Sequence, residues 1–279
     1  MMTCSHPTRN PRWPLLLLSI LALTSGCERS GTRPQLVAPI SSKKITPKTA
    51  NAPAPSAKVS EPAKPPASAF SRVVCIDPGH PSETSTGAEA HGLSENRLNW
   101  QVAVALRERL REMGVRSVLT KQSENEYVTN RQRAETANRA KAALFIRLHC
   151  DEGSGKGFTW YYPDRSGSKQ GVTGPSQSVQ RASRQAVQIL NDVMQPILAG
   201  SLASNPIKTD ASTFVGGKQG GVLTGSIFSR VPMALIEMCF INQKADAKFI
   251  ASAAGRDKMA EALAVAIVAY LEATQRSGL

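Results

Sequence analysis

The sequence predicts an α/β fold in which a mostly parallel central sheet is flanked by helices on both faces. Two observations lead to this prediction. Short apolar runs, typical of buried parallel strands, alternate with longer segments of helical periodicity from residue 73 onward. The composition also changes near residue 70, so residues 71–279 are expected to form one compact domain. The residues before it are rich in Pro, Ala, Ser and Lys and are expected not to belong to that domain.

Residues 1–27 have the composition of a secretory signal peptide. Two arginines precede an apolar run over residues 15–23, which small residues and Cys27 follow. The run is too short for a comfortable transmembrane helix. Residues 24–27 resemble a bacterial lipobox, in which the cysteine becomes the lipid-bearing N-terminus and tethers the protein to a membrane; a soluble secreted protein and an uncleaved anchor are the alternatives. In each case the protein is expected in the periplasm or cell envelope.

Residues 28–70 are rich in Pro, Ala, Ser and Lys and have almost no aromatic residues. Such a segment cannot bury enough apolar surface to offset its ordering entropy, so it is predicted to be a disordered tether. The formal net charge of the chain is +13, of which the tether carries +5. A basic tether suits an anionic surface such as lipid headgroups or wall polymer, although excess lysine also simply keeps a linker solvated. We find no nucleic-acid recognition motif, and export argues against such a partner.

The first half of the domain predicts strands and helices in alternation. Val73–Ile76 is a short apolar run that ends at an Asp-Pro-Gly turn. Ser94 is a suitable N-cap, Glu95 in the first turn complements the helix dipole, and apolar residues recur at helical spacing until Gly114. The elements predicted to follow are a strand over residues 115–120, a helix over 131–141 and a strand over 143–148.

The second half continues the same pattern. The predicted elements are a strand over residues 158–162, a helix over 178–198, a buried strand over 233–240 and a closing helix over 256–273. The segment between Tyr162 and Ser178 is short, polar and Gly-rich, so no extra helix that covers the ligand crevice is expected there.

Two histidines follow apolar strands of the predicted sheet. The carboxyl ends of parallel strands meet at one edge, so His80 and His149 are expected to point into one crevice, although a single such histidine is more often structural. Glu95 at the nearby helix start adds an oxygen ligand. Two imidazoles, one carboxylate and an open position are typical of a catalytic zinc site, where the metal lowers the pKa of water and polarises a carbonyl. His91 is expected to line the cleft or face solvent.

One further carboxylate lies where a strand should be wholly apolar. Glu237 interrupts the run VPMALIEMCFIN, and an unpaired charge buried there would cost several kcal/mol. A buried carboxylate that carries protons beside the metal explains its presence better than chance does.

Several segments together resemble the zinc-dependent N-acetylmuramoyl-L-alanine amidases of the amidase-3 family. They are Asp77–His80, Gly92–Glu95, Phe145–His149 and Leu235–Asn242, with Arg131–Asn138 as a further match. The resemblance covers essentially all of residues 71–273 and implies a single zinc amidase catalytic domain.

The resemblance also implies roles. His80, Glu95 and His149 would bind Zn²⁺, and Glu237 would act as general base and then as acid to the leaving amine. The substrate would be peptidoglycan, cut between muramic acid and L-alanine during wall remodelling or daughter-cell separation, by a protein expected to be monomeric. Trp160 and its two tyrosine neighbours could stack on sugar rings, although alternation in a strand places one side of them in the core.

The chain departs from the family pattern near the site. Pro81–Ser82 replaces a usual second glycine, Arg147 and Cys150 flank His149 where small residues are common, and Met238–Cys239 replaces a Leu–Gly pair. No departure removes a ligand or the base. A zinc peptidase acting on wall stem peptides and an inactive peptidoglycan-binding module remain alternatives; a binding module has no use for Glu237.

The domain holds three cysteines, Cys75, Cys150 and Cys239, all in apolar runs. An odd number at irregular spacing does not predict a disulfide framework, so they are expected to be small buried hydrophobic residues. One pairing among them in an oxidising compartment, and metal binding by a thiolate near the site, are the alternatives.

Overall fold

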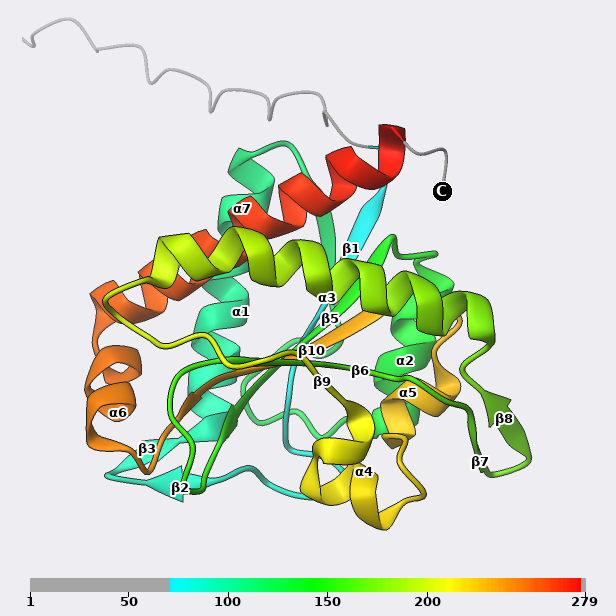
Figure 1. Ribbon diagram of the computed structural model, residues 1–279, viewed down its shortest axis with the longest axis horizontal. Helices are drawn as coiled ribbons and strands as arrows, with labels where there is room; N and C mark the ends of the chain where they lie inside the picture. Colours follow the sequence, from blue (N-terminus) through cyan, green and yellow to red (C-terminus); the bar gives the residue numbers. More distant parts are fainter. Residues whose placement is uncertain (1–70, 277–279) are drawn as a thin grey trace, which may run out of the picture. The chain divides into compact units, whose positions relative to one another are not determined.

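A computed structural model describes residues 71–276 of the chain, drawn as a ribbon in Figure 1. The predicted signal peptide over residues 1–27, the predicted lipid attachment at Cys27 and the predicted tether over residues 28–70 lie outside the described residues. These interpretations therefore stay predictions.

A six-stranded sheet forms the centre of the domain, with the strand order β4-β1-β5-β10-β6-β9. Its strands are β1 (Val73–Pro78), β4 (Arg116–Leu119), β5 (Leu144–Asp151), β6 (Thr159–Tyr162), β9 (Lys208–Thr209) and β10 (Met233–Phe240). β4, β1, β5 and β10 are parallel neighbours, while β6 runs antiparallel to β10. The prediction of a mostly parallel sheet is confirmed, and β10 has the predicted bounds.

One face of the sheet is covered by α1 (Glu95–Glu112), α3 (Gln177–Leu198) and α7 (Ala253–Arg276), with α6 (Lys244–Ala251) preceding α7. Figure 1 shows α3 and α7 side by side, and the largest hydrophobic cluster lies between these helices and the strands. Leu106 and Leu110 of α1 are completely buried there, and truncating one such leucine to alanine costs about 2–5 kcal/mol. Gly114, with φ 72°, ends α1 as predicted, whereas the Ser94 side chain makes no capping hydrogen bond.

The opposite face carries the shorter helices α2 (Asn130–Arg139), α4 (Phe214–Lys218) and α5 (Thr224–Phe228). α2 begins with a capping box in which Thr129 and Gln132 exchange side-chain and backbone hydrogen bonds. Two small clusters pack under these helices, one around Phe145 and one around Tyr161. Helices therefore flank both faces, as the sequence predicts.

Several short elements complete the fold. They are β2 (Glu89–Ala90), β3 (Leu93–Ser94), β7 (Gly167–Lys169), β8 (Val172–Gly174) and the 3₁₀ turn η1 (Asp210–Ser212). The segment between Tyr162 and Ser178 contains the β7–β8 hairpin and no covering helix, which confirms that prediction.

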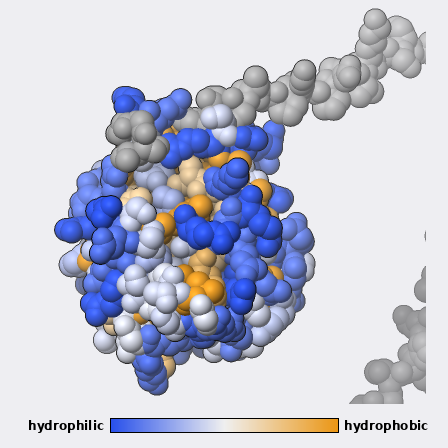
Figure 2. Space-filling view, turned by 90° about the vertical axis from the view of Figure 1, so that its right-hand side faces the viewer, coloured by the Kyte–Doolittle hydropathy of each residue, from blue (hydrophilic) through white to orange (hydrophobic). Residues whose placement is uncertain are grey.

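The face of the domain in Figure 2 is mainly polar. Hydrophilic residues cover most of the face in Figure 2, and apolar residues form small groups between them. Within residues 71–276, no helix combines the length and the apolar character needed to cross a bilayer.

Candidate functional site

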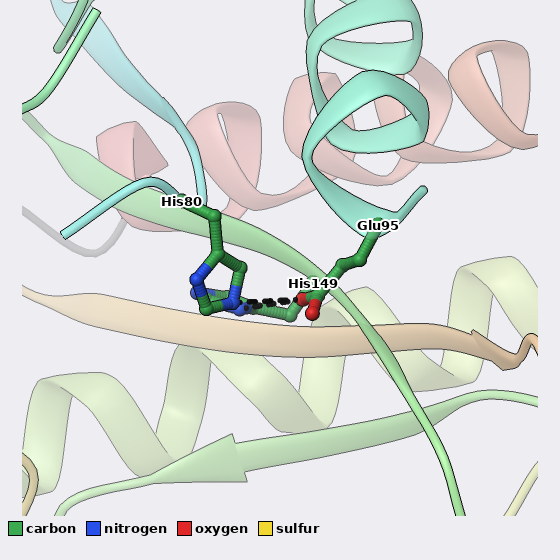
Figure 3. A group of neighbouring side chains, drawn as sticks. All are labelled: His80, Glu95 and His149. Atoms are coloured by element: carbon green, nitrogen blue, oxygen red, sulfur yellow. Dashed lines mark hydrogen bonds and ion pairs between the residues drawn. The ribbon is translucent and has the colours of Figure 1, made fainter. Parts of the chain in front are cut away.

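Three side chains with metal-binding atoms meet at the carboxyl edge of the sheet (Figure 3). His80 follows β1, Glu95 is the first residue of α1, and His149 belongs to β5. Glu95 Oε1 lies 3.1 Å from His80 Nε2 and 3.0 Å from His149 Nδ1. Ligand atoms of all three residues lie within 4.8 Å of one another. The fold therefore brings together the three residues that the sequence singled out as metal ligands.

The backbone around the two histidines differs in one respect from expectation. His80 lies beyond β1, as predicted, but His149 lies inside β5, because pairing with β10 continues as far as Asp151. Gly79 allows the close approach of the two segments, since a Cβ at this position would lie 2.3 Å from His149 Cε1. An alanine at Gly79 would require the His149 ring to move.

Backbone and side-chain donors fix the orientation of Glu95. Its Oε2 accepts a hydrogen bond from Ala88 N at 2.9 Å, and its Oε1 accepts one from Cys150 N at 3.1 Å. Burial by itself raises the pKa of Glu95, but hydrogen bonds from His149 and His80 outweigh it and hold that pKa below its ordinary value. Burial lowers the pKa of His149 to about 4. The site thus holds an ionised carboxylate and a neutral imidazole, the forms that bind metal.

Two buried polar atoms at the site have no partner within the described residues. They are His149 Nε2 and Glu237 Oε2. Buried polar atoms are nearly always paired, so orphans at one site indicate a missing partner. Two imidazole nitrogens and a carboxylate oxygen form a donor set that suits zinc, and the site therefore fits the metal that the sequence predicts.

Glu237 lies beside these residues in the sheet. Its Cα pairs with His149 of β5 on one side and with Thr159 of β6 on the other, and paired residues point to the same face. Among the eight residues of β10, Glu237 alone is only partly buried, because one side of it lines the cleft while its Oε2 is shut off from solvent. Burial of its carboxyl group, followed by the charges of Glu95 and Asp151, raises its pKa well above the ordinary value. Such a carboxylate can take up a proton.

A buried network of charged side chains supports the backbone on both sides of His80. Asp77 accepts hydrogen bonds from Arg133 Nη1 at 2.5 Å and from Arg147 Nε at 2.8 Å. Arg133 also donates to Pro78 O and Pro81 O, each at 2.8 Å, and so holds the backbone on both sides of His80. Burial alone raises the pKa of Asp77, but the charges of the two arginines hold it well below its usual range.

This network is absent from the predictions made from the sequence. Arg147 enters them only as a departure from the family pattern, although an arginine inside the apolar run Phe145–Leu148 is itself a signal. A cation in a buried strand needs an anionic partner, because an unpaired one is costly. Asp77 at the end of the neighbouring strand is that partner.

A cleft of about 470 Å³ opens over the site. Tyr161, Leu223 and Leu235 form an apolar wall, and Phe214 on α4 stands at the rim with its side chain 77% exposed. Trp160, which the sequence offered as a sugar-stacking residue, is fully buried in the core. His91 is exposed, and its Nε2 lies 3.0 Å from Asn242 O. It is not part of the group formed by His80, Glu95 and His149.

Comparisons with known proteins agree on one family. The profile of a family described as N-acetylmuramoyl-L-alanine amidase matches residues 74–269. The amidase LytC of Bacillus subtilis (strain 168) is 29% identical over 227 residues, 79% of this chain and 39% of LytC. The amidase Rv3717 of Mycobacterium tuberculosis is 28% identical over 234 residues, 75% of this chain and 90% of that relative. The matched part of this chain spans less than half the length of three of its curated relatives.

The solved structures share the fold. The apo form of the amidase Ami1 from Mycobacterium abscessus has a TM-score of 0.61 at 22% identity, over 72% of this chain and 99% of that chain. At this level of identity the likeness shows the α/β architecture.

Proposed function

This chain belongs to the N-acetylmuramoyl-L-alanine amidase family, and we propose that it hydrolyses the amide bond between muramic acid and L-alanine in peptidoglycan. One observation carries the proposal. Two imidazoles and two carboxylates meet at one cleft, on the strands and the helix start where the family match lies. We propose that His80, Glu95 and His149 hold Zn²⁺ and that Glu237 is the catalytic acid and base.

The zinc ion, when bound, supplies Lewis-acid activation of water and of the scissile carbonyl. Glu237 takes the proton from the attacking water as the new C–O bond forms. The same carboxyl group then protonates the departing nitrogen of L-alanine as the C–N bond breaks. The products are a lactyl carboxylate on muramic acid and a stem peptide with a free amine. The hydrogen bonds from Ala88 N and Cys150 N keep the Glu95 carboxylate oriented during this cycle.

The walls of the cleft suit a glycopeptide. Phe214 offers an exposed aromatic face, and Lys218 Nζ lies 3.8 Å from the centre of its ring. An aromatic ring beside an ammonium group can contact both a sugar face and a stem-peptide carboxylate. The apolar wall around Tyr161 can receive the alanine methyl group.

A direct assay of products tests the proposal. The full chain is incubated with purified peptidoglycan, with zinc or with a chelator, and the soluble products are identified by mass spectrometry. We expect free stem peptides that begin at L-alanine, and we expect chelation to abolish their release. Shortened stems still attached to sugar would instead mean a zinc peptidase. Binding to peptidoglycan without any release would mean a binding module, and either result contradicts the proposal.

We also propose that the protein is exported and anchored by lipid on Cys27. The support is the composition of residues 1–27, together with the location of peptidoglycan outside the cytoplasm. Replacing Cys27 by alanine is expected to move the protein from the membrane to the soluble envelope fraction, as measured by fractionation and immunoblotting. An unchanged membrane fraction would contradict lipid anchoring.

A further inference from the structure

Two cysteines from different strands face each other beside the metal centre. Cys150 follows His149 in β5, and Cys239 lies two residues after Glu237 in β10. Their sulfur atoms are 3.7 Å apart, and both side chains are buried. Cys75, the third cysteine of residues 71–276, belongs to the hydrophobic cluster on the opposite face of the sheet.

An irregularity in β10 creates this juxtaposition. Regular alternation would turn Cys239 to the same face as Glu237, toward the cleft. The register with β5 shifts between Glu237 and Phe240, and both Met238 and Cys239 join the large core cluster that also contains Cys150. The bulge therefore lets β10 present a carboxyl group to the cleft and a thiol to Cys150.

Cys150 and Cys239 lie on neighbouring strands that are hydrogen-bonded to each other. Neighbouring strands lie about 4.7–4.9 Å apart, and disulfides join Cα atoms about 4.4–6.8 Å apart. To form the bond, the sulfur atoms need to approach from 3.7 Å to about 2.05 Å. The bond would replace a contact between two thiols without adding an atom to the core.

We propose that Cys150 and Cys239 form a disulfide that joins β5 to β10 in the exported protein. The oxidant is an external disulfide, such as that of an envelope oxidoreductase or of oxidised glutathione. One thiolate attacks it to give a mixed disulfide, and the second thiolate displaces the external thiolate. Both cysteines lose their protons, and the external disulfide is reduced to two thiols.

The bond forms during folding, because the folded domain buries both thiols from any external reagent. It closes a chain segment of 89 residues, which removes entropy from the unfolded state. It also ties the strand of His149 to the strand of Glu237. The inference concerns the cysteines alone and does not depend on the amidase reaction.

Peptide mapping tests the proposal, because trypsin places each of the three cysteines of residues 71–276 in its own peptide. These are residues 73–97, 148–156 and 231–244. The full chain is unfolded with denaturant and reductant, refolded in a mixture of reduced and oxidised glutathione, and alkylated with iodoacetamide in denaturant before digestion. We expect peptide 148–156 linked to peptide 231–244, with peptide 73–97 alkylated. Alkylation of all three peptides, or a link that includes peptide 73–97, would overturn the proposal.

Thermal unfolding provides a second measurement. The oxidised chain is expected to melt about 5–15 °C above the reduced chain, since a loop of this length contributes several degrees in a domain of this size. Cys75→Ala should keep this difference, whereas the double variant Cys150→Ala/Cys239→Ala should lose it. Equal melting temperatures of oxidised and reduced wild type would contradict the bond. The release of stem peptides is assayed separately, so failure of one proposal leaves the other standing.

Discussion

Replacing Glu237 by glutamine is expected to lower kcat on peptidoglycan by about a hundred- to ten-thousand-fold, the range that general acid–base groups contribute. Glutamine keeps the shape of the side chain at the centre of β10 but cannot accept a proton from water. Zinc content should not change, because the proposed ligands are His80, Glu95 and His149. The measurements are kcat and KM from the rate of stem-peptide release, and bound zinc from elemental mass spectrometry.

Glu152 provides the matched control for this variant. It also lines the cleft and carries a carboxylate, but it is exposed and lies outside the metal-binding group. Glu152→Gln should change kcat less than about threefold, since it removes the same charge without removing a proton carrier. If Glu237→Gln keeps more than a tenth of the activity, another group is the base. If it loses zinc, Glu237 is a ligand instead.

Five of the six strands of the central sheet could be predicted, the most deeply buried of them from apolar runs, whereas the two-residue strand β9 is too short to show a pattern. Val73–Ile76 and Met233–Phe240 are long enough to display that pattern, and the amphipathic helices between them show the 3.6-residue period. The helices α4 and α5 could not be predicted, because five residues cover little more than one turn and show no period. Their positions depend on packing against the sheet, which no local pattern records.

The site could be predicted in part for a similar reason. Parallel strands end at the same edge of a sheet, so the apolar runs that precede His80 and His149 are enough to place both side chains at one crevice. The buried ion pairs between Asp77 and the two arginines could not be predicted in this way. Arg147 and Asp77 are 70 residues apart in the chain, and only the register of β1 against β5 makes them neighbours. The shift in β10 that turns Cys239 toward Cys150 is likewise a property of strand pairing.

The second large expected effect concerns stability. Replacing Asp77 by alanine should lower the free energy of unfolding by about 3–5 kcal/mol, the usual cost of breaking a buried ion pair by removing one partner. Asp77, Arg133 and Arg147 are almost completely buried, so the variant leaves two guanidinium groups in the core without their carboxylate. Urea unfolding of the full chain, followed by circular dichroism, measures the loss.

The same network predicts a dependence on pH. Folding depresses the pKa of Asp77, so its contribution to stability is fully present above the ordinary carboxyl pKa of about 4 and is lost as the pH falls below it. The wild type should therefore lose stability between about pH 4 and pH 2, and Asp77→Ala should lose less over that interval. Parallel pH profiles of the two proteins would contradict the assignment.

Burial of an ion pair, rather than the distance between its nitrogen and oxygen atoms, decides how much stability is lost when the carboxylate is removed. Arg109 Nη2 and Asp257 Oδ1 are also 2.5 Å apart, the distance between Arg133 Nη1 and Asp77 Oδ1, but the Asp257 side chain is 61% exposed. Water solvates both partners of the exposed pair once it is broken, so Asp257→Ala should cost less than about 1 kcal/mol. In the buried pair no water replaces the lost carboxylate. Equal losses in the two variants would mean that Arg133 and Arg147 find other partners or solvent, and that Asp77 is not needed to keep them in the core.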